Sequence, residues 1–321
     1  MPKIICHNDF DGAACAAICK CVFPDYPVVF AGIQELYNLQ ITPQDIICDL
    51  PYPRECGLWF DHHAGNFEEL KLRELNIESI PGERREEKSC AKIVFEYFRE
   101  KGLPDFLAEL VAAADKVDSM DYENVEQYIA ETPDRIAALS IDLKSETYGQ
   151  KLGYMKFLAD NLTKNSLTRI CEMDEVKNRY NAAKSEEKRD FETIEKYLFF
   201  LTADEGKEIG IIDGSQWKRK NILNRNLAYI LFPHIVAVSC IDPVFQRGIK
   251  TNDLHVSTSL NPFREPRGKD IGEIFRELNI GSGHRGAAGG VFHYKNKQER
   301  ILNYKKDLER IFILWKKQKP D

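Results

Sequence analysis

Residues 3–18 read KIICHNDFDGAACAAI, and this stretch decides the fold of the N-terminal half. Lys3 to Cys6 is a short run with β-branched residues and predicts a strand. Ala13 to Ile18 is a strong helix pattern. The polar residues between them predict a tight loop. Strand, loop and helix in this order are typical of the first unit of a parallel α/β sheet.

Three more runs of strand length follow, at residues 28–31, 45–48 and 57–60. They contain almost no polar residues, and helical patterns separate them. This pattern predicts a parallel sheet with helices on both faces. Ligands of such sheets bind beyond the carboxyl ends of the strands. Reactive side chains at those ends are therefore the candidates for a functional site.

Composition limits the possible function classes. The 321 residues are 43% hydrophobic, enough for one large core or two modest ones. The net charge of −6 and the pI near 5.8 give no overall signature of nucleic-acid binding, so any such contact must be local. Asp9 and Asp11 interrupt the N-terminal apolar stretch, which excludes a signal peptide. No run approaches the roughly 20 apolar residues of a membrane span, so we expect a cytoplasmic protein without a membrane partner.

The nine cysteines form no CxxC pair. Cys15, Cys19 and Cys21 fall on one predicted helix. We interpret them as small buried hydrophobes in a reducing compartment. A zinc site is the alternative, and it lacks a nearby fourth ligand.

The second half of the chain predicts two further parts. After helices between residues 89 and 162, the charged segment 166–200 contains neither Gly nor Pro and predicts a connecting helix. A heptad helix of a homodimer is the alternative, although Glu187 interrupts its seam. Beyond it we expect a smaller α/β domain. The predicted domains are 1–165, 166–200 and 201–321. Within the last, the predicted strands are 209–213, 235–241, 255–260 and 291–294, and the predicted helices are 222–231 and 297–315.

Acidic and imidazole groups gather at the predicted strand ends of the first domain. His7, Asp9 and Asp11 follow the first strand, and Asp49 ends the third. The triplet 61–63, Asp-His-His, ends the fourth. Such ligands suit Mn²⁺ better than Mg²⁺, although Mg²⁺ is possible. More carboxylates than one cation requires indicate two ions, which can hold a bridging hydroxide and clamp a phosphoryl group.

Each of these motifs also has a structural interpretation. Asp-x-Asp-Gly is a common turn or helix cap, and His-His pairs can be structural. Their joint occurrence at successive strand ends favours the metal site.

The motifs resemble those of the DHH phosphoesterase superfamily, over nearly the whole chain. The resemblance implies that Asp61 orients the histidines and that His63 contacts the scissile phosphate or assists the leaving group. Asp115 represents the fourth motif because it directly follows an apolar run, and Asp118, one helical turn later, is the reserve. The implied ligands are His7, Asp9 and Asp49 for one metal ion, and Asp11, Asp49, His62 and Asp115 for the second.

The segment 281–289, GSGHRGAAG, is the other dense motif. It satisfies GxGxxG, but no predicted strand directly precedes it, which disfavours a dinucleotide-binding loop. A glycine-rich helix start is another structural alternative. The segment resembles the glycine-rich motif of the DHHA1 substrate-binding domain, which implies that Gly283, His284 and Arg285 bind substrate. That family carries an arginine near Asn261. Arg264 and Arg267 are candidates to replace it.

Two short basic and aromatic clusters are candidates for contact with a single strand. They are Trp217 with residues 218–220 (Lys-Arg-Lys), and Phe245 with Arg247. Solvated loops are the alternative interpretation.

The motifs and the resemblance together predict a dinuclear-metal phosphoesterase that hydrolyses short oligonucleotides or related nucleotide phosphodiesters. An exopolyphosphatase, or a nucleotide phosphomonoesterase of the 3′-phosphoadenosine 5′-phosphate type, is the alternative. A nucleotide-binding regulator without turnover is a third hypothesis, and it would not need a complete set of metal ligands.

Overall fold

The computed structural model describes residues 1–219, 223–265 and 268–319. They form two compact units, Met1–Lys184 and Ser185–Asp321. The division falls inside the long helix α10 (Asp174–Tyr197), which lies within the segment predicted to connect two domains. Within the described residues, no helix combines the length and the apolar character needed to cross a membrane.

The first unit is built on a five-stranded parallel sheet with the order β2-β1-β3-β4-β5. The strands β1 to β4 match the predicted runs to within one residue. Strand β5 was not predicted, because its residues Gly-Glu-Arg carry no apolar signal. The strands are β1 (Ile4–His7), β2 (Val28–Ala31), β3 (Ile46–Cys48), β4 (Leu58–Asp61) and β5 (Gly82–Arg84).

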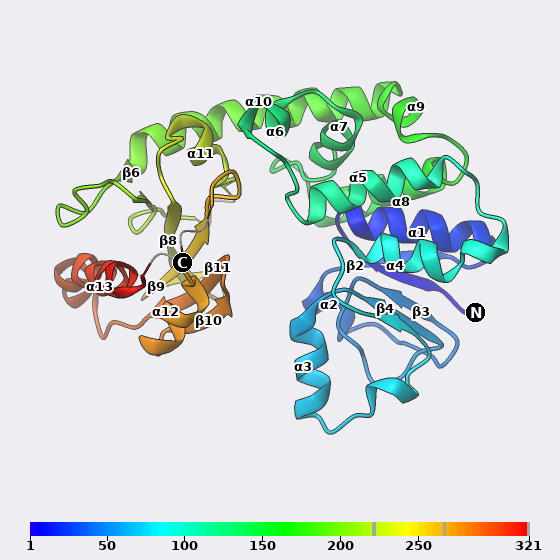
Figure 1. The fold of residues 1–321 in the computed structure, drawn as a ribbon, viewed down its shortest axis with the longest axis horizontal. Helices are drawn as coiled ribbons and strands as arrows, with labels where there is room; N and C mark the ends of the chain where they lie inside the picture. The colour runs from blue at the N-terminus through cyan, green and yellow to red at the C-terminus, as the bar shows by residue number, and fades with distance from the viewer. Residues whose placement is uncertain (220–222, 266–267, 320–321) are drawn as a thin grey trace. The chain divides into compact units, whose positions relative to one another are not determined.

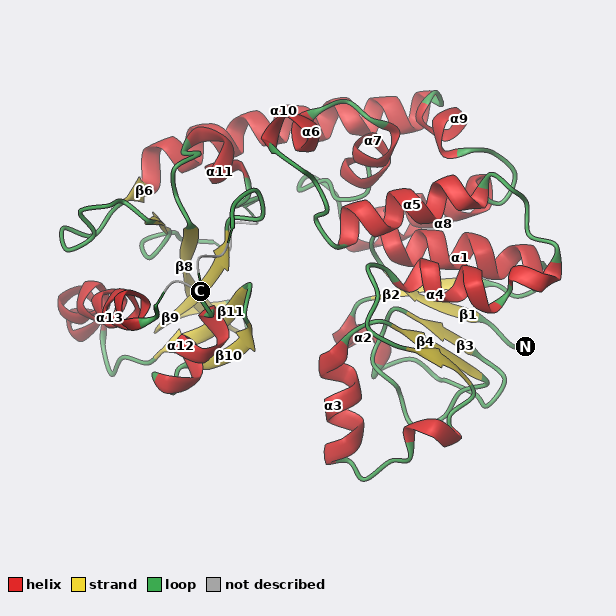
Figure 2. Ribbon diagram, in the orientation of Figure 1, coloured by secondary structure: helices red, strands yellow, loops and turns green. Residues whose placement is uncertain are grey.

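Helices cover both faces of this sheet, which confirms the prediction (Figures 1 and 2). Alternate residues of β1 enter different cores: Ile4 packs in the larger helical layer, whereas Ile5 packs with Leu36 and Leu70 on the opposite face. The larger layer contains α1 (Phe10–Val22), α4 (Cys90–Tyr97), α5 (Leu107–Asp118), α7 (Pro133–Leu139), α8 (Tyr148–Leu162) and α9 (Leu167–Cys171). The opposite layer contains α2 (Ile33–Leu36), α3 (Ala64–Leu72) and η1 (Ile77–Ser79). The short elements η2 (Arg99–Lys101) and α6 (Val125–Ile129) complete the unit.

The strand order reverses at one place in the sheet, between β1 and β3. The chain leaves β1 toward β2 on one side and returns to β3 on the other. In open parallel sheets, ligands bind at the carboxyl ends of the strands where the order reverses in this way. The ends of β1 and β3 carry His7 and Asp49.

The second unit is a smaller α/β assembly, as predicted. Its six-stranded sheet has the order β10-β11-β9-β8-β7-β6, and only β7 and β8 pair in parallel. The strands are β6 (Leu198–Phe199), β7 (Ile209–Asp213), β8 (Ala237–Gln246), β9 (Ile249–Leu260), β10 (Gly281–His284) and β11 (Ala287–Phe292). Its helices are α11 (Leu227–Leu231), α12 (Ile271–Glu277) and α13 (Lys297–Lys317), besides the end of α10.

Several predicted elements of this unit differ from the structure. The predicted strand 235–241 overlaps only the first half of β8, and the predicted strand 291–294 overlaps only the end of β11. The predicted helix 222–231 is only the short α11, and its first residue, Ile222, lies outside the described residues. The predicted strand 255–260 is the end of the longer β9, which forms a hairpin with β8. Arg247 and Gly248 turn this hairpin with positive φ angles of 48° and 78°.

The glycine-rich segment forms a hairpin, and neither a loop nor a helix start. Strands β10 and β11 pair antiparallel, with Gly281 opposite Gly290 and His284 opposite Ala287. A Cβ atom on Gly281 would lie 2.0 Å from the carbonyl oxygen of Gly289. The glycine is therefore required for close approach of the two strands.

The apolar stripe of α10 packs against the cores of this chain's own two units. Val176 packs in the core of the first unit, and Ile194 packs in a core of the second. Both side chains are fully buried. A dimer seam along this stripe, the alternative interpretation of the segment, is therefore not available.

Candidate metal centre

The residues predicted to bind metal ions gather at the carboxyl ends of β1, β3 and β4. His7 is the last residue of β1, and Asp9 is the N-cap of α1, where its Oδ1 accepts from the amide of Gly12 at 2.9 Å. Asp49 directly follows β3 and adopts a φ of 59°, a left-handed conformation that aspartate tolerates better than most residues. A Cβ atom on Gly12 would lie 1.9 Å from the carbonyl oxygen of His7, so only glycine fits there. Local backbone constraints thus fix these side chains at one point.

One group of potential ligands consists of His7, Asp9 and Asp49, whose ligand atoms all lie within 4.8 Å of one another. The His7 Nδ1 atom is 2.5 Å from Asp9 Oδ2 and 3.6 Å from Asp49 Oδ2. Burial alone would lower the pKa of His7, but hydrogen bonding to Asp49 and Asp9 raises it to about 10. The negative charges of Asp9 and Asp49 therefore strongly favour a positive charge at the position of the His7 ring.

A second group consists of Asp11, His62 and Asp118. The His62 Nε2 atom lies 3.9 Å from Asp11 Oδ2 and 3.4 Å from Asp118 Oδ2. The same atom is 3.4 Å from Asp49 Oδ1, and Asp49, His62 and His63 form a third, overlapping group. Asp49 thus links the two ligand groups.

The structure favours Asp118 over Asp115, the residue preferred from sequence, as the candidate ligand on α5. Both residues lie on α5, about one helical turn apart. Asp115 Oδ1 accepts from the hydroxyl of Ser89 at 2.6 Å, whereas Asp118 reaches His62. Proximity to the preceding apolar run does not indicate this difference, because the rotation of the helix decides which carboxylate faces His62.

Two buried polar atoms at the centre have no hydrogen-bond partner: Asp49 Oδ1 and His62 Nε2. The Nδ1 atom of His62 lies 3.0 Å from the carbonyl oxygen of Glu87, which can only accept, so Nδ1 carries the proton. In the neutral ring, Nε2 then keeps its lone pair as a metal ligand. A cation between these two atoms would satisfy both, and the residues present therefore fit a divalent metal ion.

The carboxylates of the centre repel one another. Burial and the charges of Asp49 and Asp118 raise the pKa of Asp11 well above its usual value. Burial and the charge of Asp49 raise the pKa of Asp118 to about 6. The amides of Cys90 and Ala91, at the start of α4, hold the Asp11 carboxylate at 2.7 and 2.8 Å. Bound cations would remove the remaining repulsion.

Asp61 orients only one of the two histidines. Its Oδ1 lies 2.9 Å from Nδ1 of His63, and it also accepts from the amide of His62. The ring of His62 is oriented instead by the carbonyl of Glu87. Nothing in the sequence identifies a backbone carbonyl of residue 87 as a partner of residue 62.

Asp61 is also a structural residue, since it is fully buried and accepts from Asn66 Nδ2 at 2.6 Å as well. We expect Asp61→Ala to lower the free energy of unfolding by about 3 kcal/mol or more, because each buried donor left without an acceptor costs about 1–3 kcal/mol. Asp61→Asn keeps one acceptor oxygen and should lose less. Urea unfolding would measure both, and an unchanged Asp61→Ala protein would contradict the structural role.

The second-unit residues predicted to bind substrate lie at the tip of the β10–β11 hairpin. Gly283 pairs with Ala288, whose side chain enters the core under α12 and α13. His284 therefore projects to the opposite face of the sheet. Its Nδ1 accepts from the amide of Gly286 at 3.1 Å, which leaves the Nε2 proton available as a donor. Arg285 donates from Nε to the carbonyl of Lys269 at 3.3 Å.

The structure explains the asparagine at position 261. Asn261 is buried; its Nδ2 donates to the carbonyl of Ile235, and its Oδ1 accepts from the amide of Phe263. Arg264 donates to the carbonyls of Pro233 and His234. Both side chains thus hold loops together, and neither supplies the missing arginine. The other candidate, Arg267, lies outside the described residues.

The predicted single-strand surface is supported only weakly. Trp217 packs edge-on against Tyr197, with ring centroids 5.7 Å apart, so part of its ring is not available for stacking. Phe245 is half-buried near the end of β8. Lys218 and Arg219 are exposed, and Lys220 lies outside the described residues.

The helix α1 cysteines behave as hydrophobic residues. Cys15 and Cys19 are fully buried, and burial raises the pKa of Cys15 well above its usual value. Cys21 is half-buried, with its Sγ 3.9 Å from the carbonyl of Thr163. Among the residues that the structure describes, no cysteine joins a group of potential metal ligands.

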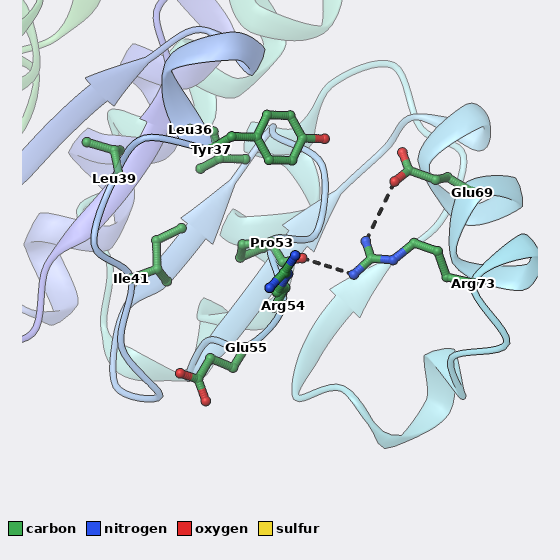
Figure 3. Close-up of a pocket in the computed structure, with 9 residues that line it drawn as sticks. All are labelled: Leu36, Tyr37, Leu39, Ile41, Pro53, Arg54, Glu55, Glu69 and Arg73. Atoms are coloured by element: carbon green, nitrogen blue, oxygen red, sulfur yellow. Dashed lines mark hydrogen bonds and ion pairs between the residues drawn. The ribbon is translucent and has the colours of Figure 1, made fainter.

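A pocket of about 610 Å³ in the first unit is separate from the metal ligands (Figure 3). Arg73 crosses it, with an ion pair to Glu69 and a hydrogen bond to the carbonyl of Pro53. The lining residues are Leu36, Tyr37, Leu39, Ile41, Pro53, Arg54, Glu55, Glu69 and Arg73. None of these lining residues is a predicted metal ligand. The candidate site is therefore identified by its cluster of carboxylate and imidazole groups and not by this pocket.

No protein-family model matches the sequence. No curated protein matches it either. Solved structures do match: that of PggH from Vibrio cholerae, a pGpG-specific phosphodiesterase, has a TM-score of 0.71 at 22% identity, over 98% of this chain and 99% of that chain. The DHH domain of a member of the s1p family of ribosomal proteins has a TM-score of 0.65 at 13% identity, over 99% and 87%. RecJ from Thermus thermophilus in complex with Mn²⁺ has a TM-score of 0.56 at 12% identity, over 99% and 52%. The chain therefore has the fold that these three proteins share, one of which is a DHH domain.

Proposed function

We propose that this chain is a divalent-metal-dependent phosphoesterase that hydrolyses short oligonucleotides or related nucleotide phosphodiesters. The observation that carries the proposal is a pair of buried atoms, Asp49 Oδ1 and His62 Nε2, which lie 3.4 Å apart among the candidate ligands and make no hydrogen bond. A purely structural cluster would satisfy these atoms internally.

Two ions, with manganese as the leading candidate, would occupy the centre. His7, Asp9 and Asp49 would hold one ion, and Asp11, Asp49, His62 and Asp118 the other. When bound, such ions lower the pKa of a coordinated water and neutralise the charge of a phosphoryl group. Mixed imidazole and carboxylate ligands favour manganese over magnesium.

His63 would contact the scissile phosphate or the leaving group. Its Nδ1 proton is held by Asp61, and about half of its side chain is exposed, so Nε2 is the atom available to substrate. Asp61 is then a positioning residue that acts through His63.

The solved structures support the substrate class. PggH is described as specific for pGpG, which is a dinucleotide, and this chain matches it over nearly its full length. The matched part of RecJ is about half of that protein. A short nucleotide diester is therefore the first substrate to test. The described residues include a full ligand set, which favours an enzyme over a regulator without turnover.

We further propose that His284 binds the substrate through Nε2. We expect His284→Ala to raise KM for a dinucleotide about 10-fold with little change in kcat, the effect of losing one hydrogen bond to a charged group. His234→Ala, at another exposed histidine of the same unit, is the matched control. Steady-state kinetics would test this, and an unchanged KM would remove His284 from the substrate site.

The decisive test is a hydrolysis screen with added Mn²⁺. The substrates are dinucleotides, 3′-phosphoadenosine 5′-phosphate, cyclic dinucleotides, polyphosphate and pyrophosphate. We expect dinucleotide hydrolysis that EDTA abolishes. Faster turnover of polyphosphate or of 3′-phosphoadenosine 5′-phosphate would favour the alternatives, and no turnover of any of them would favour the regulator.

A further inference from the structure

Tyr148 touches the metal-ligand loop from a distant part of the sequence. It is the first residue of α8, and its hydroxyl lies 3.3 Å from Asn8 Nδ2 and 3.3 Å from the amide nitrogen of Gly32. Asn8 stands between the candidate ligands His7 and Asp9, and Gly32 directly follows β2, the neighbour of β1 in the sheet. The phenol oxygen therefore contacts the loop that carries two of the candidate ligands.

The hydrogen-bonding chemistry leaves one group of Tyr148 unused. Both of its partners are N–H donors, so the hydroxyl oxygen accepts from each of them. Neither bond uses the proton of the hydroxyl itself. At the same time, 43% of the residue is exposed, although it is a large aromatic side chain that touches the loop of the candidate ligands. An exposed aromatic ring whose hydroxyl proton is still available can stack on a ligand and donate a hydrogen bond to it.

We propose that Tyr148 forms a nucleobase-binding subsite at the edge of the metal centre. The ring stacks on the base of a nucleotide whose phosphate lies at the metal ligands, and the hydroxyl donates its proton to the sugar or phosphate of that nucleotide. The inference rests on the proposed function for the identity of the ligand. It adds a stacking residue in the first unit, where the sequence motifs indicate none.

The competing explanation is that Tyr148 is only a latch. Its hydroxyl would then serve to tie the start of α8 to the loop after β1, and the ring would have no ligand. The two explanations differ in their dependence on the base. Stacking depends on a base in the ligand and on the aromatic ring of Tyr148, which phenylalanine also provides. A purely structural role depends on the hydroxyl of Tyr148, and it affects the binding of ligands with and without a base equally.

The test measures binding of methylphosphonate-linked dinucleotides, which are not hydrolysed, in the presence of Mn²⁺. One analogue carries both bases, and two others each lack one base. The proteins are the wild type, Tyr148→Phe and Tyr148→Ala, with Tyr37→Ala as an exposed tyrosine control in the same unit. Thermal melting establishes that each variant is folded.

We expect the wild type to prefer the complete analogue over one abasic analogue by about 5- to 100-fold, the range for stacking of one base on an aromatic residue. Tyr148→Ala should lose this preference, and Tyr148→Phe and Tyr37→Ala should keep it. Equal weakening of all three analogues by both Tyr148 variants would establish the latch and overturn the proposal, as would a wild type without base preference. Base-dependent binding by a wild type that hydrolyses no nucleotide diester would keep the subsite and refute the proposed function.

Discussion

The Asp49→Asn protein should be folded and should have lost Mn²⁺-dependent hydrolysis. We expect a fall in kcat/KM of at least about 10²- to 10³-fold, the loss that follows removal of one group that stabilises charge at an active site. The carboxylate is almost fully buried and belongs to two of the three overlapping groups of candidate ligands, one with His7 and one with His62. The substitution should therefore weaken both proposed metal positions. Asparagine has the same shape and tolerates the φ of 59° at this position.

Two measurements separate this effect from unfolding. Thermal melting without metal should show a folded protein, and added Mn²⁺ should stabilise the wild type but not the variant, since a ligand stabilises only a state that binds it. Asp45→Asn is the matched control. Asp45 is fully buried just before β3 and accepts from the amides of Lys3 and Thr42, away from the carboxyl end. It should retain activity, and an active Asp49→Asn protein would refute the assignment of the centre.

The second large effect distinguishes the two carboxylates of α5. Asp118→Asn should reduce kcat/KM about 10²-fold or more, because it removes a charged ligand from the group around His62. Asp115→Asn should change it far less, because its side-chain oxygen can still accept the proton of Ser89. The two substitutions are chemically identical and lie on the same helix, so each controls for the other.

Titration of Mn²⁺ followed by calorimetry would complete this comparison. The Asp118→Asn protein should bind fewer ions or bind one of them more weakly, and the Asp115→Asn protein should bind like the wild type. The reverse pattern would restore Asp115 as the ligand and would mean that α5 presents its other face to the site.

Sequence patterns predicted the parallel sheet because each strand is a compact apolar run with its own local signal. They could not predict β5, whose three residues are polar or glycine and which forms only because β4 offers it an edge. The β10–β11 hairpin was not predicted for a related reason, although the predicted strand 291–294 overlaps the end of β11. Glycines give no strand signal, and their role is visible only when the two backbones are seen in contact.

The part of the candidate site that could be predicted consists of residues that lie next to strand ends in the sequence. His7, Asp9, Asp49 and His62 follow strands, and the ends of parallel strands converge by topology. The choice between Asp115 and Asp118 was not predictable, since it depends on the rotation of a helix about its axis. Glu87, Ser89 and Tyr148 were missed as well, because each acts through a tertiary contact with a residue far away in the sequence.

The carboxylates of Asp9 and Asp11 both accept hydrogen bonds from backbone amides, and we propose that both also bind metal ions. Asp9 accepts from the amide of Gly12, and Asp11 accepts from the amides of Cys90 and Ala91. Any cation that draws electron density from these carboxylates weakens the same three hydrogen bonds. With a diamagnetic ion such as Mg²⁺ or Zn²⁺, the nuclear magnetic resonances of those backbone amides would shift as the ligands fill. Gly12 would then report on one position and Cys90 with Ala91 on the other, so the order of loading could be followed without any substrate.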